Sequence, residues 1–184
     1  MEAYEAIVTR RSVPNPSDDQ VERELVEKLL EAGVRAPSHY LTQPWRFVVL
    51  TGDARLELGK AWAISAKRQG KDPERTREKV RRAPVIICVI EQPKTNVARV
   101  IETEEHYAVG AVIENILLAA HALGLGAMIR TGDAASSAEV RAYLDVKDDE
   151  LLAAFIYVGH RQDNAQKPLT RRADAAEKTE WRGW

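Results

Sequence analysis

The chain has 184 residues, of which 45% are hydrophobic and 30% are charged, and its formal net charge is −1. This composition is typical of an ordinary globular protein, and the near-zero charge gives no reason to expect nucleic acid or an anionic membrane as a partner. The one cysteine, Cys88, cannot form an internal disulfide and is interpreted as a core thiol in a reducing compartment. The first residues lack the pattern of a signal peptide, so we expect one domain over residues 1–184, located in the cytoplasm.

The spacing of apolar residues predicts helices and strands along the first part of the chain. Ser17 and Gln20 form a capping box ahead of a helix that Gly33 ends. The charged segment from Lys67 to Arg82 is interpreted as a solvated connection plus a helix, because acidic residues among its bases argue against a nucleic-acid patch. The other elements expected here are a helix at about Ala3 to Thr9, a strand at Arg46 to Leu50, and a helix that contains Leu56, Leu58, Ala61, Trp62 and Ile64.

A continuous apolar run from Val85 to Ile90 predicts a central strand that is buried on both faces. The stretch from Tyr107 to Ile129 is also largely apolar, but polar residues interrupt it, so we interpret it as a core helix and not as a membrane span. This helix is expected from about Glu102 to Leu123, with Gly124 just past its end, in a dimer interface. The remaining elements are a strand at Gly126 to Ile129, a helix near Ser137 to Leu144, a strand at Leu151 to Val158, and an extended tail from about residue 162 that packs on the partner chain.

The sequence contains no motif for a metal site or for catalysis by protein groups alone. The four histidines have no metal-ligand spacing, and there is no Cys-x-x-Cys pair. The fragment Gly124-Leu125-Gly126 follows a predicted helix and not a strand, so a dinucleotide-binding fingerprint fails on context. If the protein is an enzyme, a cofactor therefore carries the reactivity.

Three polar segments carry the candidate binding residues. Arg10-Arg11-Ser12 offers two guanidinium forks and a hydroxyl, which together suit a phosphate group. The segment from Arg35 to Phe47 contains Pro37 and Pro44, which predict a rigid connection between a helix and a strand. Arg130-Thr131-Gly132 follows the end of a predicted strand. Each segment also has a plain structural interpretation: a solvated arginine pair, a turn between prolines and an ordinary loop.

In this order, the segments resemble the nitroreductase family over about residues 3 to 161. The motifs are Arg10-Arg11-Ser12, then Arg35-Ala36-Pro37-Ser38-His39 with Gln43-Pro44-Trp45-Arg46-Phe47, then Gly124-Leu125-Gly126-Ala127 leading into Arg130-Thr131-Gly132. The resemblance implies an α+β fold, with an antiparallel-dominated central sheet wrapped by helices, and a homodimer with FMN at the interface. It also implies ping-pong transfer of hydride from NADH or NADPH to a nitroaromatic, a quinone or a similar small oxidant.

The same resemblance assigns roles to individual residues. No side chain is expected to be catalytic, because N5 of the flavin carries the chemistry. The cofactor-binding residues implied are Arg10, Arg11 and Ser12 at the phosphate and at the ribityl or pyrimidine side, Arg35 and His39 from the partner chain, Gln43, and Ile129, Arg130 and Thr131 at the border of the flavin. The nicotinamide nucleotide is expected at Ala119, Ala120, His121, Ala122, Leu123 and Gly124.

Three departures from the family pattern affect the redox potential and the choice of substrate. Leu41 replaces a familiar Asn, Pro14 stands where a basic residue is common, and Ile129 replaces an aromatic residue. Two other functions therefore stay open on the same scaffold. One is a non-catalytic flavin-binding or sensing protein, and the other is a specialised flavin enzyme for dehalogenation, flavin fragmentation or azoline oxidation.

Overall fold

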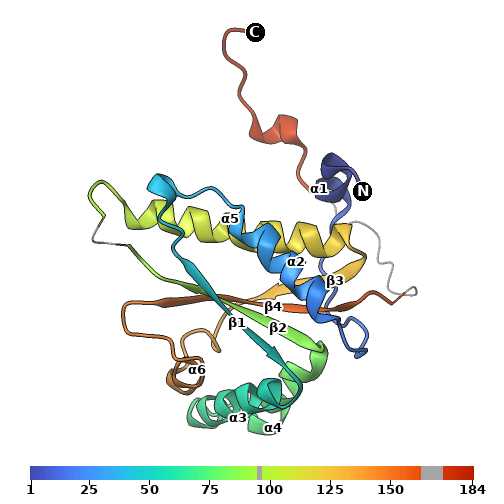
Figure 1. Cartoon of the computed structure of the whole chain (residues 1–184), viewed down its shortest axis with the longest axis vertical. Helices are drawn as coiled ribbons and strands as arrows, with labels where there is room; N and C mark the ends of the chain where they lie inside the picture. The colour runs from blue at the N-terminus through green and yellow to red at the C-terminus, as the bar shows by residue number, and fades with distance from the viewer. Residues whose placement is uncertain (95–96, 163–171) are drawn as a thin grey trace.

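The fold is built on one antiparallel sheet of four strands in the order β1-β2-β4-β3 (Figure 1). A computed structural model describes residues 1–94, 97–162 and 172–184. The strands are β1 (Trp45–Thr51), β2 (Val85–Glu91), β3 (Leu125–Arg130) and β4 (Leu151–His160). This arrangement, with helices around the sheet, confirms the expected α+β class.

Helices lie on both faces of the sheet (Figure 1). One face carries α2 (Arg23–Val34) and α5 (Glu102–Ala122), and the short helix α1 (Ala3–Thr9) contacts α5. The other face carries α3 (Gly52–Arg68), α4 (Pro73–Arg77) and α6 (Ala138–Tyr143). Three 3₁₀-helices complete the described structure: η1 (His39–Leu41), η2 (Glu78–Arg82) and η4 (Ala175–Lys178).

Strand β2 is buried along its whole length and separates two apolar cores. Its residues Val85, Ile87 and Val89 pack toward α2 and α5, while Ile86, Cys88 and Ile90 pack into the second core beneath α3 and α6. The alternation follows from the two-residue period of a strand. Burial raises the pKa of the Cys88 thiol to about 12, which fits a core thiol.

Helix α5 packs on α2 through a glycine. A Cβ added at Gly33 would lie 3.0 Å from Cγ1 of Ile116, so the absent side chain lets the two helices approach closely. The expectation that Gly33 ends its helix is therefore wrong by one residue, because α2 continues to Val34 and Gly33 serves packing within its last turn. None of the helices described here is long and apolar enough to cross a membrane.

The predicted capping box ahead of α2 is also wrong. The helix begins at Arg23, and Glu22 precedes it without a side-chain cap. The Ser17 hydroxyl instead bonds the carboxylate of Asp19, and the Ser17 N–H donates to the carbonyl of His160 at 2.8 Å. Ser17 is thus used to fasten the incoming chain to the end of β4, a long-range contact that local sequence does not reveal.

The charged segment from Lys67 to Arg82 contains the expected helix, but it is anchored to α3 as well as solvated. Thr76 and Val80 are buried, and a Cβ at Gly59 would lie 2.7 Å from the carbonyl oxygen of Arg77. The small residue in α3 therefore allows the backbone of the segment to lie directly against the helix.

A charged network fixes the start of β1 to the chain before β4. Nε and Nη2 of Arg46 donate to the two carboxylate oxygens of Glu150 at 3.0 and 2.6 Å. The side-chain amide of Gln92 and the backbone N–H of Lys147 also donate to this carboxylate. The bidentate bond from Arg46, with these further donors, lowers the pKa of Glu150 to about 2.

We predict that Glu150→Gln destabilises the fold near neutral pH. The folded pKa of Glu150 lies below its unfolded value, so its contribution is fully present above about pH 4.5 and is lost as the pH falls toward 2. We expect the substitution to lower the free energy of unfolding by about 2 kcal/mol at pH 7 and by much less at pH 3. Urea denaturation at both pH values measures this, and equal losses at the two pH values would contradict the assignment.

Candidate functional site

The segment after α1 runs along the edge strand β3. The N–H of Val13 donates to the carbonyl of Ala127 at 2.9 Å, and Nη2 of Arg130 donates to the carbonyl of Pro14 at 3.3 Å. Gly126 makes this contact possible, because a Cβ there would lie 2.9 Å from Cγ1 of Val13. The structure therefore fastens the two residues that follow the first predicted motif, Val13 and Pro14, to the strand that leads into the third motif, Arg130-Thr131-Gly132.

Helix α5 holds the first arginine of this segment. Nε of Arg10 donates to Oε1 of Glu114 at 3.0 Å, and the Arg10 side chain is 20% exposed. Arg11 is half-buried and Ser12 is exposed. Two guanidinium groups and a hydroxyl thus follow one another just before Val13, with one arginine oriented by a carboxylate of α5.

A second group of cations surrounds the end of β3. The guanidinium of Arg130 lies 5.1 Å from the ring of Tyr157, and burial, followed by the nearby charge of Arg82, lowers the pKa of Arg130. Its Nε is buried and has no hydrogen-bond partner in the described part of the chain. Lys79 lies over the ring of Trp62 at 4.5 Å, and burial lowers its pKa.

These side chains line a cavity of about 440 Å³ at the end of β3. Three of its lining residues, Lys79, Arg82 and Arg130, are cationic, and Asp133 is the one acid among the lining residues described. A cavity with this excess of positive charge favours a ligand that carries or develops negative charge. It is lined by Trp62, Lys79, Arg82, Met128, Ile129, Arg130, Thr131, Gly132 and Asp133.

The second predicted motif lies elsewhere on the same chain. Arg35 follows α2 and is exposed, and its Nη2 lies 3.4 Å from Oε1 of Glu31. Nε2 of His39 lies 3.9 Å from Oε2 of Glu104, near the start of α5. Gln43 is exposed, and its N–H donates to the Ser38 hydroxyl at 3.2 Å.

The loop that carries His39 has an unusual backbone. Tyr40, Leu41 and Gln43 have φ values of 50°, 55° and 46°, in the left-handed region that residues other than glycine rarely adopt. Tyr40 and Leu41 are also exposed apolar residues. Backbone strain of this kind persists where a site or an interface requires it, so the loop is a candidate contact surface.

Helix α5 separates the two groups of predicted residues. Arg10 contacts Glu114, whereas His39 approaches Glu104, ten positions earlier. Ten residues of α-helix span about 15 Å. In Figure 1, η1 lies near one end of α5, and α1 and β3 lie near the other. Within one chain, His39 therefore lies well away from Arg10. Arg35 lies nearer the middle of α5, because Gly33, two residues before it, packs against Ile116.

The segment expected to meet a nicotinamide nucleotide forms the C-terminal end of α5. Ala120 and His121 are buried, Ala119 is half-buried, and residues 122–124 are exposed. Gly124 has a φ of 79°, and its N–H donates to the carbonyl of His121, which fits its predicted place after the helix. Nε2 of His121 lies 2.9 Å from Oγ1 of Thr9, so this side chain is directed into the protein and not toward a ligand.

Several residues around the cavity did not emerge from the sequence. Trp62, Lys79 and Arg82 belong to α3 and η2, and in the sequence they are part of an ordinary helix and a charged run. Glu114, which holds Arg10 away from the cavity lining, did carry a signal, since it interrupts an apolar helix. The cation–π contact and the cavity arise from packing between distant segments, which spacing alone does not predict.

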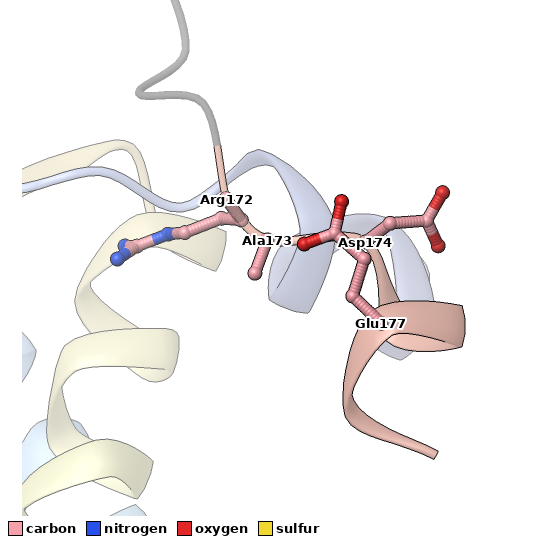
Figure 2. A pocket seen from close by; sticks show the side chains of 4 residues that line it. All are labelled: Arg172, Ala173, Asp174 and Glu177. Carbon is pink, nitrogen blue, oxygen red and sulfur yellow. The ribbon is translucent and has the colours of Figure 1, made fainter. Parts of the chain in front are cut away.

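The described part of the C-terminal tail lies away from the residues that line the cavity at the end of β3 (Figure 1). Arg172, Ala173, Asp174 and Glu177 line a hollow of about 500 Å³. Figure 2 shows the Arg172 side chain extended away from Asp174 and Glu177. All four residues belong to the tail and are exposed. The hollow therefore lacks the buried walls of a ligand site. The predicted tail from residue 162 lies partly outside the described residues.

Comparison with known proteins decides the family. The model of the "Nitroreductase family" matches residues 7–160. The chain belongs to the nitroreductase family. This confirms the family and the nitroreductase-type oxidoreductase class inferred from the sequence. The Escherichia coli K12 protein YdjA, provisionally named an NAD(P)H nitroreductase, is 32% identical over 175 residues, which cover 92% of this chain and 93% of YdjA.

Solved nitroreductases have the same fold. A provisionally named nitroreductase from Desulfovibrio desulfuricans, crystallised in complex with FMN, is 32% identical with a TM-score of 0.78 over 100% of this chain and 98% of its own. A nitroreductase-like family protein from Bacillus cereus has a TM-score of 0.87 at 22% identity, over 100% of this chain and 97% of its own. The nitroreductase-like fold expected from the sequence is thereby confirmed.

We predict that Gly126→Ala destabilises the junction between residues 10–14 and β3. The new methyl group would overlap the side chain of Val13, and such overpacking costs about 1–3 kcal/mol. Gly110→Ala is the matched control, because nothing lies within 4 Å of a Cβ at Gly110 in α5. Chemical denaturation of the two variants and the wild type measures the difference. A Gly126→Ala variant as stable as the control would show that the close approach is not required.

Proposed function

We propose that the protein is an FMN-dependent oxidoreductase that takes hydride from NADH or NADPH and passes it to a nitroaromatic, a quinone or a similar small oxidant. One observation carries the proposal: Val13 and Pro14, which directly follow residues 10–12, are bonded to β3, and a cationic cavity of about 440 Å³ lies at the end of that strand. Because the chain belongs to the nitroreductase family, we interpret this geometry as a binding site for a redox cofactor. A ping-pong sequence follows if both redox partners use the same open face of one cofactor.

The described residues fit FMN. Arg10, Arg11 and Ser12 offer charge-assisted hydrogen bonds to a phosphate, and Arg130 has a buried Nε that lacks a protein partner among the described residues. The relative from Desulfovibrio desulfuricans, which was crystallised with FMN, supports this choice. When bound, FMN supplies hydride acceptance and donation at N5. The task of the protein is to bind and orient it.

The positive charge of the cavity has a role in this scheme. Lys79, Arg82 and Arg130 create a positive potential that stabilises negative charge developing on an electron-rich ring. The low dielectric around half-buried Arg130 strengthens this effect. Fixed cations stabilise charge without acting as catalytic side chains. The site is therefore compatible with the prediction that no side chain is catalytic.

A second copy of the chain completes the proposed site. His39 lies at the far part of α5 from Arg10, so we expect it to reach a flavin from a partner chain. Arg35 is assigned to the same partner chain by the family resemblance alone. Exposed apolar side chains at Tyr40, Leu41 and Tyr107 lie on or beside the same part of α5 and provide surface for a homodimer. We extend the proposal to the tail, which would pack on the partner of a single-domain chain.

The nicotinamide nucleotide would meet the exposed end of α5. Residues 122–124 offer backbone groups and little side-chain bulk there, since the side chain of His121 is turned inward. The provisional name of YdjA includes NAD(P)H and supports such a donor. A solved NfnB from Mycobacterium smegmatis in complex with NADPH shares the fold, with a TM-score of 0.79.

The first test is the colour of the protein. We expect the purified protein, after addition of FMN, to keep a flavin absorption band that bleaches with NADH or NADPH and returns with a nitroaromatic or a quinone. Absorption spectra recorded under anaerobic conditions follow the reduction by NADH or NADPH and the reoxidation by the oxidant as separate steps. A coloured protein that does not bleach would support a sensing role, and failure to bind FMN would contradict the proposal.

The second test is the Arg10→Ala variant. Loss of a charge-assisted bond to phosphate should weaken FMN binding by about 1.5–3 kcal/mol, which is measured by fluorescence quenching of FMN. Arg23→Ala is the matched control, since the exposed Arg23 pairs only with Glu27 among the described carboxylates. Equal FMN affinity in the two variants would refute the role of Arg10.

A further inference from the structure

Helix α1 has little to hold it in place. Ala6 is the one buried residue among its seven, and Tyr4 and Ile7 are exposed. Its last residue, Thr9, directly precedes Arg10. Any interaction that fixes Thr9 therefore also fixes where the phosphate-binding segment begins.

The hydrogen bonds of His121 define its tautomer. The Thr9 hydroxyl donates its one proton to the carbonyl of Glu5 at 2.6 Å, so at 2.9 Å it can only accept from Nε2–H of His121. On the other side, Nη1 of Arg161 lies 3.5 Å from Nδ1, and a guanidinium can only donate. Thr9 therefore requires a proton on Nε2 and Arg161 requires an unprotonated Nδ1, and only the neutral Nε2–H tautomer satisfies both neighbours.

The surroundings of His121 favour the neutral form. The residue is 7% exposed, and burial lowers its pKa, with further lowering by nearby arginines. A proton on Nδ1 would remove the acceptor for Arg161 and add a charge beside other cations. The charged groups that face it are Glu5 of α1, which opposes the shift, Arg10 and Arg11 after α1, and Arg161 after β4.

We propose that His121 is a positioning residue that, while neutral, ties Thr9 to Arg161 and so holds residues 10–12 in place for a phosphate group. Protonation of Nδ1 removes the bond from Arg161, which follows β4, and so breaks the link, although Nε2–H can still donate to Thr9. The identity of the phosphate as that of FMN rests on the proposed function. The link itself depends only on the two hydrogen bonds.

The sign of the pH effect follows from the lowered pKa. In the unfolded chain His121 titrates near 6.5, and in the folded chain it titrates at lower pH. The stabilisation by neutral His121 is therefore complete above about pH 6.5 and is lost as the pH falls through the folded pKa. We expect the segment to loosen at acid pH.

The first experiment examines the imidazole directly. Nitrogen-15 NMR of the purified protein, with and without FMN, should show His121 as the Nε2–H tautomer with a pKa below that of a histidine peptide. His121→Gln identifies the signals. An Nδ1–H tautomer, or a pKa at or above the peptide value, would overturn the assignment whether or not FMN binds.

The second experiment measures FMN affinity at pH 7.5 and at a pH one unit below the pKa that NMR gives for His121. His121→Gln keeps a donor for Thr9 and does not titrate, so it should match the wild type at pH 7.5 and bind about 3–10-fold tighter than the wild type at the lower pH. His121→Leu removes both bonds and should bind about 3–10-fold more weakly than the wild type at pH 7.5. The phosphate itself titrates near pH 6 in all three proteins, so only ratios between proteins are compared.

Two outcomes would overturn the positioning role. One is a His121→Gln profile that follows the wild type at both pH values, and the other is wild-type affinity in His121→Leu. A wild-type protein that binds no FMN at either pH would instead refute the proposed function. In that case the tautomer and pKa measured by NMR still decide the link between Thr9 and Arg161.

Discussion

The candidate site depends on the contact between residues 13–14, which directly follow the Arg10-Arg11-Ser12 segment, and the edge strand β3. A backbone hydrogen bond from Val13 to Ala127, a missing side chain at Gly126 and the bond from Arg130 to Pro14 hold the two segments together. Without this contact, the cations of the N-terminal segment and those at the end of β3 would belong to separate surfaces. The edge position of β3 leaves room for such a segment, because no further strand pairs there within the described sheet.

Helix α5 contacts most of the residues that position the candidate site. Its buried side completes one apolar core, and its polar positions Glu114 and His121 hold Arg10 and Thr9. Its first turns meet His39 through Glu104. The same helix therefore contacts Arg10 and His39, but at positions about 15 Å apart along its axis. A site that needs both Arg10 and His39 must combine Arg10 of one chain with His39 of another.

Local pattern predicted the elements well, and long-range packing explains what it missed. The buried run from Val85 to Ile90 and the long helix are strong periodic signals, and both are present. The role of Ser17 was misread because its partner, His160, is far away in sequence. Lys79 and Trp62 could not be paired from spacing, and the inward direction of His121 depends on α1 and β4. The residue types in the sequence were enough to predict a phosphate site, whereas the residues that line the cavity could be identified only from the folded structure.

The most direct test of a shared site mixes two defective chains. Arg10→Ala and His39→Ala homodimers should each bind FMN weakly, because every site lacks one group. After the two proteins are mixed and allowed to exchange subunits, each mixed dimer should regain one intact site, seen as tight binding of one FMN per mixed dimer in equilibrium titration. If Arg10 and His39 served the same chain's site, no mixture would restore tight binding, and the account of a flavin held between two copies would be contradicted.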